Sequence, residues 1–431
     1  MKIRLYNARI MTMAEGCSLL QGEIWVENDR ILYVGDGTDL DAFCKRTGIP
    51  GLAADKEIDC EGNVLMPGFK DAHTHSAMVA MRSFADDMPL QEWLNTKIFP
   101  LEAKMTEQDN YDLTQLAILE YLTTGVTSVF DMYLSPKDIA RACVDMGMRC
   151  VLVSGLNKFG PALEVMEERY LTLNRMHPLI SYMLGVHAEY TCSRELLEQV
   201  SEMVHKYKAP LFTHISETRT ETDECLERYG MTPPQFLDSL FDYGGGGYHC
   251  VHFTEEDMDL FAKKGLHIIT NPGSNTKLAS GVAPITRFLE KGINVGIGTD
   301  GASSNNCLDM FREMYLACVL QKLRREDAAA CPAGDLLYAA CSAGARAMGL
   351  PDCDSLAPGK AADLAVIDLK RPSMRPLLAP AQNLVYSGSK DCVRLTMVGG
   401  RILYENGEFH VGDSVEHIIA EAEKYTEELI Q

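Results

Sequence analysis

Residues 63–75 read NVLMPGFKDAHTH, a short apolar run that ends in two histidines two positions apart. Such a run is typical of a buried parallel strand that carries chemistry at its carboxyl end. Side chains at positions i and i+2 of a strand project from the same face, so His73 and His75 can reach one cation. We therefore predict that this stretch is the first strand of the main domain.

Seven further apolar runs follow, and amphipathic segments separate them. They are VTSVFDM (126–132), RCVLVSG (149–155), ISYMLGVH (180–187), PLFTH (210–214), YHCVH (248–252), HIIT (267–270) and NVGIGTD (294–300). Eight β/α units in roughly 290 residues predict an α/β fold, the (β/α)8 TIM-like barrel, whose active sites lie at the carboxyl ends of the strands. The glycine run 244–247 is interpreted as a flexible loop.

The two flanks of the chain differ from this pattern. Residues 1–60 and 361–431 contain short strand-like runs and turn dipeptides such as Asn406-Gly407. Neither flank is large enough to be stable alone, so we expect both to pair into one small β-sandwich domain. The barrel would then cover residues 61–360, and the last segment, SVEHIIAEAEKYTEELI, would form a terminal helix.

Composition excludes several classes of partner. The 431 residues include 40 Lys and Arg against 61 Asp and Glu, which gives a formal charge of -21 that repels nucleic acid and anionic lipid. No apolar run reaches the roughly 18 residues of a membrane span, and the N-terminus lacks the pattern of a secretory signal. Fourteen scattered cysteines fit reduced thiols, so we expect a cytoplasmic protein.

Residues that commonly bind metal ions lie at three more strand ends. His214, His249 and Asp300 join the pair His73 and His75 at the predicted barrel mouth. Such a nitrogen- and oxygen-rich set suits one divalent ion, with Zn²⁺ favoured over Fe²⁺ or Mn²⁺. Residue types alone leave open whether His249 binds the ion or orients a water. The alternative, hydrogen-bonded core histidines, would have to hold at several strand ends at once.

The end of the fourth strand argues for one ion rather than two. Two-metal barrels of this kind bridge their ions with a carboxylated lysine at a middle strand. Here that strand end reads LGVHAEY and offers His187 and Glu189 but no lysine.

Glu217 lies three residues after His214, at the predicted turn from strand to helix. A carboxylate at this place can lean over the ion and shuttle protons, since a divalent ion lowers the pKa of water while the leaving nitrogen still needs a proton. The alternative is a glutamate of the first helical turn that the helix dipole stabilises. His252, close to His249, is interpreted as a supporting residue.

Eight segments spread over essentially the whole chain resemble one family. They are MPGFKDAHTHSAM, MRSFADDMPLQEWL, VHAEYTCS, HISET, HCVHF, NPGSNTKLASG, GTDGASSNN and LAPGKAADLAVID. The chain is similar to the amidohydrolase superfamily, in the branch of methylthioadenosine and S-adenosylhomocysteine deaminases, guanine deaminases and chlorotriazine hydrolases.

The resemblance implies specific roles for residues of this chain. The metal ligands would be His73, His75, His214 and Asp300. His249 and Asp300 would act on the attacking water, and Glu217 would donate a proton to the ring nitrogen beside the attacked carbon. The resemblance also suggests a homo-oligomer, a dimer or tetramer.

The resemblance further implies three substrate contacts. Glu102 would bind the ribose hydroxyls, His187 would face the sugar, and Trp93 would wall the base pocket. A carboxylate can accept hydrogen bonds from both hydroxyls of a vicinal diol, which makes the first of these roles chemically sound.

Three departures from the family pattern bear on the substrate. Ser154 and Val144 stand where relatives that use S-adenosylhomocysteine tend to carry arginines, although Arg141 is one turn from Val144. Glu189 replaces the usual proline of H-A-P-Y and is expected to add negative charge near the pocket. An unpaired amino-acid carboxylate would be costly there, so we predict weak use of S-adenosylhomocysteine.

The reaction expected from these residues is hydrolytic deamination of an adenine nucleoside, such as 5′-deoxyadenosine, methylthioadenosine or adenosine. One alternative is deamination or dechlorination of another heterocycle, such as guanine, a triazine or a xenobiotic. The alternative from another class is a barrel that has lost catalysis and serves as a metal-binding scaffold; the shuttle carboxylate Glu217 argues against it.

Overall fold

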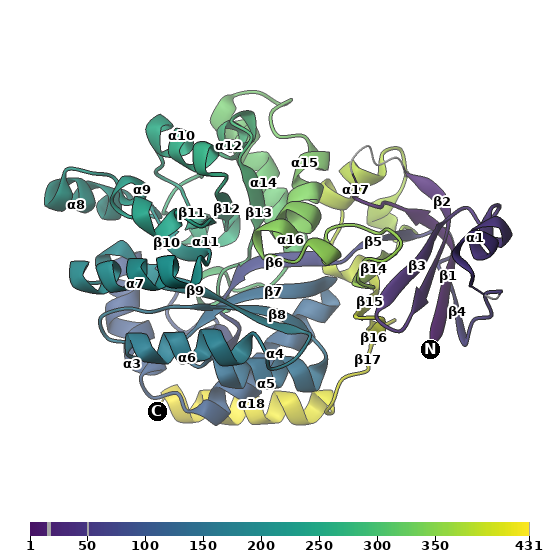
Figure 1. The fold of residues 1–431 in the computed structure, drawn as a ribbon, viewed down its shortest axis with the longest axis horizontal. Coiled ribbons are helices and arrows are strands. Elements are labelled where there is room, and N and C mark those ends of the chain that lie inside the picture. Colours follow the sequence, from purple (N-terminus) through teal and green to yellow (C-terminus); the bar gives the residue numbers. More distant parts are fainter. Residues whose placement is uncertain (15–18, 50, 431) are drawn as a thin grey trace.

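Eight parallel strands form a barrel in the computed structural model, which describes residues 1–14, 19–49 and 51–430 (Figure 1). They are β6 (Phe69–Thr74), β7 (Val126–Tyr133), β8 (Arg149–Ser154), β9 (Ile180–Ala188), β10 (Leu211–Ile215), β11 (Gly245–His249), β12 (His267–Thr270) and β13 (Asn294–Ile297). Each strand pairs with the next one along the chain. This confirms the (β/α)8 fold.

The first predicted strand is divided in two. β5 (Val64–Pro67) pairs with β14 (Leu364–Ile367) in a second sheet, and only β6 belongs to the barrel. Gly68 lies between the two strands. The residue there must be glycine, because a Cβ atom would lie 2.1 Å from a methyl group of Thr127. The prediction of a single strand was therefore wrong, and the chain crosses between the two sheets at this glycine.

The glycine run is a strand and not a flexible loop. Gly245 begins β11, which pairs with both β10 and β12. A Cβ atom on Gly245 would lie 1.9 Å from the Leu211 carbonyl oxygen, and one on Gly246 would lie 2.1 Å from the His267 carbonyl oxygen. The glycines are thus required by close contact with the neighbouring strands, which the sequence pattern did not reveal.

Most helices surround the barrel or lie in its loops, whereas α1 lies in the second domain, where Phe43 packs with Trp25 and Tyr33. The longer ones are α4 (Glu107–Thr123), α5 (Pro136–Met146), α6 (Leu163–Leu173), α7 (Arg194–Tyr207), α8 (Arg219–Tyr229), α10 (Glu255–Lys264), α14 (Met310–Arg325) and α18 (Val415–Ile430). The shorter ones are α1 (Leu40–Thr47), α2 (Leu90–Trp93), α3 (Phe99–Glu102), α9 (Pro233–Phe236), α11 (Pro272–Lys277), α12 (Ile285–Glu290), α13 (Ala302–Asn305), α15 (Ala333–Tyr338), α16 (Gly344–Ala347) and α17 (Pro380–Tyr386).

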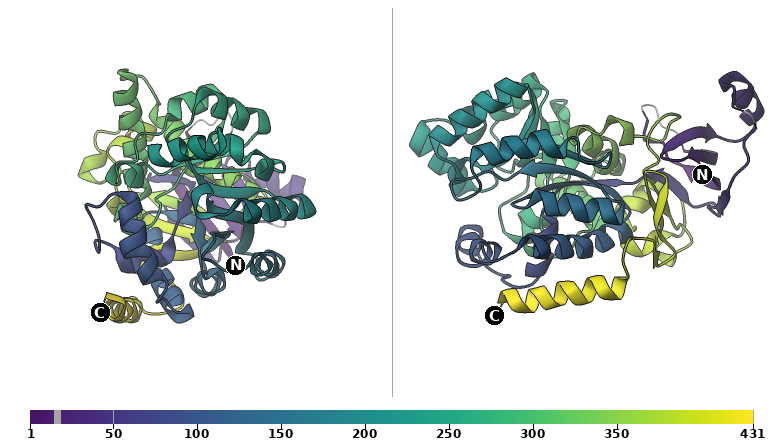
Figure 2. Two further views of the ribbon diagram at one scale, coloured as in Figure 1. Left: turned by 90° about the vertical axis from the view of Figure 1, so that its left-hand side faces the viewer. Right: turned by 60° about the horizontal axis from the view of Figure 1, so that its bottom comes forward.

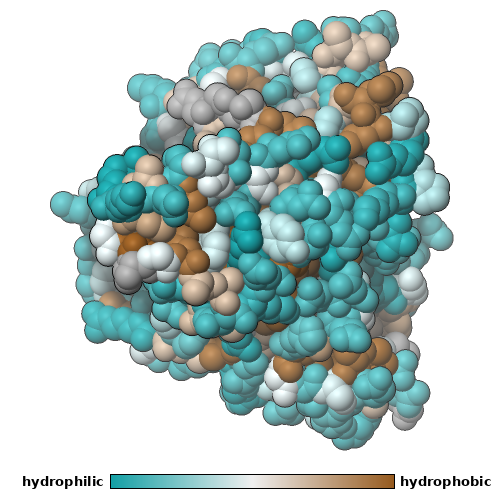
Figure 3. Space-filling view, turned by 90° about the vertical axis from the view of Figure 1, so that its right-hand side faces the viewer, coloured by the Kyte–Doolittle hydropathy of each residue, from teal (hydrophilic) through white to brown (hydrophobic). Residues whose placement is uncertain are grey.

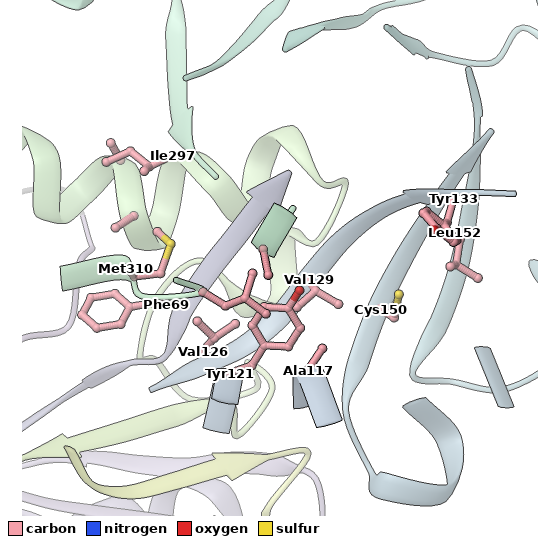
Figure 4. Close-up of a cluster of buried hydrophobic side chains, with 14 of the residues drawn as sticks. Phe69, Ala117, Tyr121, Val126, Val129, Tyr133, Cys150, Leu152, Ile297 and Met310 are labelled. Carbon is pink, nitrogen blue, oxygen red and sulfur yellow. The ribbon is translucent and has the colours of Figure 1, made fainter. Parts of the chain in front are cut away.

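A continuous apolar core lies between the barrel strands and their helices. Phe69 of β6, Val129 of β7 and Tyr121 of α4 are buried together there (Figure 4). Helix α4 begins at a capping box, in which Thr106 and Asp109 satisfy each other's backbone N–H groups. This core holds α4 against β6 and β7; Tyr133 is the last residue of β7, and His75 follows β6 directly.

The two ends of the chain form the second domain, as expected. Its described strands, in spatial order, are β17 (Glu408–Phe409), β16 (Arg401–Glu405), β15 (Val393–Val398), β14, β5, β1 (Lys2–Ile10), β2 (Leu20–Glu27) and β3 (Arg30–Gly35), with β4 (Lys56–Asp59) also paired to β1. Leu5 and Ile24 share one buried core with Leu364 and Leu395, so both halves enclose it. The molecular face at this end is mostly hydrophilic (Figure 3).

The second domain is fixed to the barrel by a buried ion pair. Arg149 of β8 donates to Asp363 through Nε at 2.6 Å and Nη2 at 3.0 Å. The chain then returns to the barrel, where α18 packs along α4 (Figure 2). The domain boundaries at residues 60 and 360 stay predictions.

The described residues include neither a membrane-spanning helix nor a disulfide bond. No helix among them is both long and apolar enough to cross a membrane. Every cysteine among them is unpaired, and all but Cys192 and Cys307 are buried. The cysteines thus behave as small core residues, which agrees with reduced thiols.

Candidate active site

Three histidines and one aspartate meet at the carboxyl end of the barrel. His73 Nε2 lies 3.2 Å from His214 Nε2 and 3.6 Å from Asp300 Oδ1. His75 Nε2 lies 3.2 Å from the same Asp300 oxygen. The four residues come from β6, the residue after it, β10 and the segment after β13, so barrel closure brings together the ligands expected from the sequence.

Hydrogen bonds at the outer ring nitrogens orient two of these imidazoles. His75 Nδ1 donates to the Met132 carbonyl oxygen, and His214 Nδ1 donates to the His187 carbonyl oxygen at 2.6 Å. A carbonyl can only accept, so Nδ1 of each ring carries a proton, and Nε2 presents a lone pair to the centre of the cluster whenever the ring is neutral. Lone pairs of several imidazoles and a carboxylate oxygen that face one another fit a divalent cation.

Asp300 is held in a conformation that few residues adopt. Its φ is 61°, in the left-handed region, and His249 and Ser216 share this property with φ of 69° and 50°. Ser274 donates to Asp300 Oδ2 at 2.6 Å and the Gly301 amide donates to Oδ1 at 2.8 Å. Burial alone would raise the pKa of Asp300, but the hydrogen bond and charge of His75 hold that pKa well below its usual range.

His249 lies at the end of β11 with its ring fixed by an amide. Its Nδ1 lies 2.8 Å from Asn275 Oδ1, an acceptor, and 3.3 Å from Asn271 Nδ2, a donor. The shorter contact assigns Nδ1 as the donor, which leaves Nε2 to accept when the ring is neutral. That Nε2 lies 3.9 Å from Glu217 Oε2. His249 also lies within ligand distance of His73 and Asp300. Its position is compatible with either role considered from the sequence, binding the ion or orienting a water.

Glu217 is buried beside the histidine cluster. Burial raises the pKa of its carboxyl, and Ser280 donates to Oε1 at 3.3 Å. The backbone N–H groups of Ser216 and Glu217 both donate to Glu221, which fixes the turn that presents Glu217. His252 bonds through Nε2 to the Ser280 carbonyl oxygen at 2.8 Å, an arrangement that fits a supporting residue.

A cavity of about 570 Å³ opens over this cluster. Its lining includes the three residues implied to contact substrate, Trp93, Glu102 and His187, together with Glu217 and His249. The catalytic and substrate-contact residues therefore share one space of the size expected for a small-molecule site.

Two titratable groups at the side of this cavity have strongly shifted pKa values. Burial raises the pKa of Glu102 to about 7, although His75 and the hydroxyl of Tyr133 act in the opposite direction. Burial and the neighbouring His75 lower the pKa of His187 to about 4. His187 is thus a neutral imidazole at pH 7, and its Nδ1 lies 3.2 Å from the Thr191 hydroxyl.

The residues singled out as departures from the family pattern do not line the cavity. Glu189 is buried and pairs with Arg228 of α8 at 2.7 Å. The expectation that it adds negative charge near the pocket was therefore wrong. Ser154 is buried and accepts from the Leu156 amide, and Val144 lies in α5 against the core. Arg141 covers the ring of Tyr111, 4.3 Å from the ring centroid.

Four supporting residues were missed from the sequence. Ser274, Asn275 and Ser280 lie in the quoted segment NPGSNTKLASG and bond to Asp300, His249 and Glu217. Asp71 accepts from the Thr299 amide at 2.8 Å and the Thr299 hydroxyl at 2.6 Å, which joins β6 to the segment that carries Asp300. A run of Ser and Asn beside a predicted strand end was the available signal for the first three.

Comparison with known proteins agrees with this geometry. A model of the Amidohydrolase family matches residues 64–403, which include all the residues of the cluster. The chain belongs to the amidohydrolase family. Among amidohydrolases, it is 41% identical over 95% of both chains to a 5-methylthioadenosine/S-adenosylhomocysteine deaminase of Desulfitobacterium hafniense.

Two more relatives are similar over most of their length. A 5′-deoxyadenosine deaminase of Methanothermobacter thermautotrophicus is 38% identical over 91% of both chains. The crystal structure of an adenosine deaminase from Xanthomonas campestris with bound zinc superposes with a TM-score of 0.92 at 29% identity, over 99% of this chain and 98% of that one.

Proposed function

We propose that this amidohydrolase is a metal-dependent deaminase that hydrolyses the 6-amino group of an adenine nucleoside. The reaction consumes one water and releases ammonia and the corresponding inosine product. The observation that carries the proposal is Glu217, a buried carboxyl of raised pKa that faces the same cavity as His249 and Asp300. The relatives whose names include adenosine, 5′-deoxyadenosine and methylthioadenosine deaminase support this substrate class.

We further propose that His73, His75, His214 and Asp300 hold one Zn²⁺ ion, a metal that such a set suits; Fe²⁺ and Mn²⁺ take the same ligands. When bound, the ion supplies Lewis acidity that lowers the pKa of water toward neutrality. The supporting observation is that Nε2 of His73 and Nε2 of His214 lie 3.2 Å apart at the centre of the cluster, where a cation can accept the lone pairs of neutral imidazoles.

In this proposal the chain's own residues move the protons. Asp300 Oδ1 and His249 Nε2 accept from the attacking water, and the neutral carboxyl of Glu217 donates to N1 of the purine ring as the C6–O bond forms. Glu217, then a carboxylate, takes the remaining proton of the added hydroxyl group and passes it to the amino group, which leaves as ammonia when the C6–N bond breaks. The water proton that passed to Asp300 restores the neutral carboxyl of Glu217. The raised pKa of Glu217 suits this use, since a general acid must hold its proton near neutral pH.

We assign recognition of the sugar to Glu102 and His187. Ionised Glu102 accepts hydrogen bonds from the 2′ and 3′ hydroxyls, and Trp93 packs beside the base. No Arg or Lys is present among the described residues that line the cavity, so a charged amino-acid tail finds no partner there. We therefore propose 5′-deoxyadenosine and methylthioadenosine as better substrates than S-adenosylhomocysteine.

A substrate panel tests the proposal. Purified metal-loaded protein is incubated with adenosine, 5′-deoxyadenosine, methylthioadenosine, S-adenosylhomocysteine and guanine, and both the ultraviolet spectrum and ammonia are followed. We expect conversion of the first three with equimolar ammonia. Conversion of guanine alone, or of none of the adenosines, would refute the substrate class. A homo-oligomeric state and a cytoplasmic location stay predictions that this experiment does not address.

A further inference from the structure

Phe159 is a large apolar side chain that is both exposed and part of the active-site cavity. Its exposed fraction is 78%, the second highest among the large hydrophobic residues described, yet it lines the space above the histidine cluster. The residue lies in the segment 155–161 that follows β8. An aromatic ring left in water at the edge of a binding cavity gains free energy if a ligand covers it.

The segment that carries Phe159 is tethered rather than free. The Lys158 amide donates to the Thr191 carbonyl oxygen at 2.9 Å, which ties the segment to the loop after β9. The Phe159 amide donates to Asn157 Oδ1 at 2.8 Å, and the Gly160 amide donates to the Asn157 carbonyl oxygen at 3.2 Å. The backbone at Phe159 is therefore placed before any ligand binds.

The order of strands shows which part of a substrate Phe159 would meet. β8 lies between β7 and β9 in the barrel. Tyr133, at the end of β7, lines the cavity together with Glu102, and His187 is the second-last residue of β9. Glu217 and His249 come from β10 and β11, farther around the barrel. Phe159 thus emerges between the two residues assigned to the sugar and away from the groups that act on the purine.

The cavity around Phe159 is apolar. The cavity lining includes Leu134, directly after β7, and Pro161, two residues after Phe159. Ala103, next to Glu102, also lines it. The ionisable residues of the described lining are Glu102, His187, Tyr133, Tyr190 and the groups near the proposed metal site, and none of them is Lys or Arg. Lys158 is not part of this lining, although its Nζ lies 5.0 Å from the centroid of the Phe159 ring. A substituent that leaves the sugar in this direction and stays within the cavity would meet mainly hydrocarbon.

We propose that Phe159 is a specificity-determining residue that covers the 5′ substituent of the bound nucleoside and favours an uncharged apolar group, such as a methylthio group. This inference rests on the proposed function. The ring contributes binding energy only where the substituent is large enough to reach it, so methylthioadenosine depends on Phe159 more than adenosine does.

The test compares kcat and KM for methylthioadenosine and adenosine in wild-type protein and in Phe159→Ala. We expect kcat/KM for methylthioadenosine to fall about fivefold or more, mainly through KM, since part of one aromatic side chain no longer contacts the substituent. The value for adenosine should stay within about twofold. Phe159→Leu should restore most of the loss because it keeps apolar surface at that place.

Leu378→Ala is the matched control, because Leu378 is 87% exposed and does not line the cavity. It should leave both substrates unchanged. An equal fall for both substrates in Phe159→Ala, or no fall for methylthioadenosine, would overturn the role of Phe159 while the deaminase assignment stands. Failure of the wild-type protein to convert either nucleoside would instead refute the proposed function, and the role of Phe159 with it.

Discussion

His73 Nε2 and His214 Nε2 lie 3.2 Å apart, although 141 positions separate the two residues in the chain. His214 Nε2 carries no proton, because Nδ1 of the same ring donates to a carbonyl oxygen. A nitrogen lone pair held this close to a second imidazole, which itself lies 3.6 Å from Asp300 Oδ1, is stabilised when a cation lies among the three groups. The same closure of the barrel brings Glu217 and His249 to within 3.9 Å.

Replacement of Glu217 by Gln should nearly abolish deamination while the metal stays bound. The amide keeps the size of the side chain but cannot donate and recover a proton, so we expect kcat to fall by about 10²- to 10⁴-fold. Metal content by mass spectrometry should equal that of the wild-type protein, since Glu217 is outside the proposed ligand set. Glu224→Gln, on the exposed face of α8, is the control and should keep full activity.

Removal of the Glu102 carboxylate should lower activity on ribosides, because their 2′ and 3′ hydroxyls lose a hydrogen-bond acceptor. We expect Glu102→Gln to lower kcat/KM for adenosine by about 10- to 100-fold, the size of a lost charge-assisted hydrogen bond. In steady-state assays the same variant should treat 2′,3′-dideoxyadenosine almost as the wild type does, because that substrate has no diol to bind. An equal loss for both nucleosides would contradict the role assigned to Glu102.

Much of this site could be predicted from the sequence because its residues terminate strands. A strand end is marked locally by an apolar run, and the (β/α)8 topology places all such ends at one mouth. His73, His214 and Asp300 were therefore found without knowledge of any contact. Local contacts are of the same kind: the capping box of α4 joins Thr106 to Asp109, which are only three positions apart.

Features that depend on distant contacts could not be predicted in this way. The role of Asp71 depends on Thr299, which is 228 positions away. Glu189 was expected to add negative charge near the pocket because it replaces the proline of H-A-P-Y, but its side chain pairs with Arg228 of another element. The glycines of β11 read as a loop, since the strands that leave no room for side chains lie elsewhere in the chain.

The ion pair between the domains should contribute strongly to stability. Asp363 is fully buried, and Arg149 contacts it through two nitrogens. Arg149→Ala would leave that charge buried and unpaired, which we expect to cost about 3–5 kcal/mol in the free energy of unfolding. Chemical denaturation measures it. Arg194→Ala, which removes an exposed pair with Glu198, should change stability by less than about 0.5 kcal/mol.

Glu313 should make the protein less stable as the pH rises through neutrality. This buried residue accepts from the Gly273 amide and from Asn305, and burial raises its pKa from 4.5 to about 8. Between about pH 4.5 and pH 8, the folded state keeps a proton that the unfolded state has released. The stabilisation of the folded state by this proton is complete below about pH 4.5 and is lost as the pH rises to about 8.

Urea unfolding at several pH values between 5 and 8 measures this effect. Glu313 can contribute at most about 1.4 kcal/mol per pH unit to the slope. Glu313→Gln keeps an oxygen for the Gly273 amide but does not titrate, so its stability should fall less steeply with pH than that of the wild type. Identical slopes for the two proteins would show that Glu313 is ionised in the folded state.

Metal stoichiometry tests the central claim most directly. After equilibration with Zn²⁺ and removal of free ions, mass spectrometry should find one tightly bound ion per wild-type chain. It should find almost none in a His73→Ala, His214→Ala double variant whose circular dichroism is unchanged. An empty wild-type protein, two ions per chain, or an ion retained by the double variant would contradict the site described for this chain.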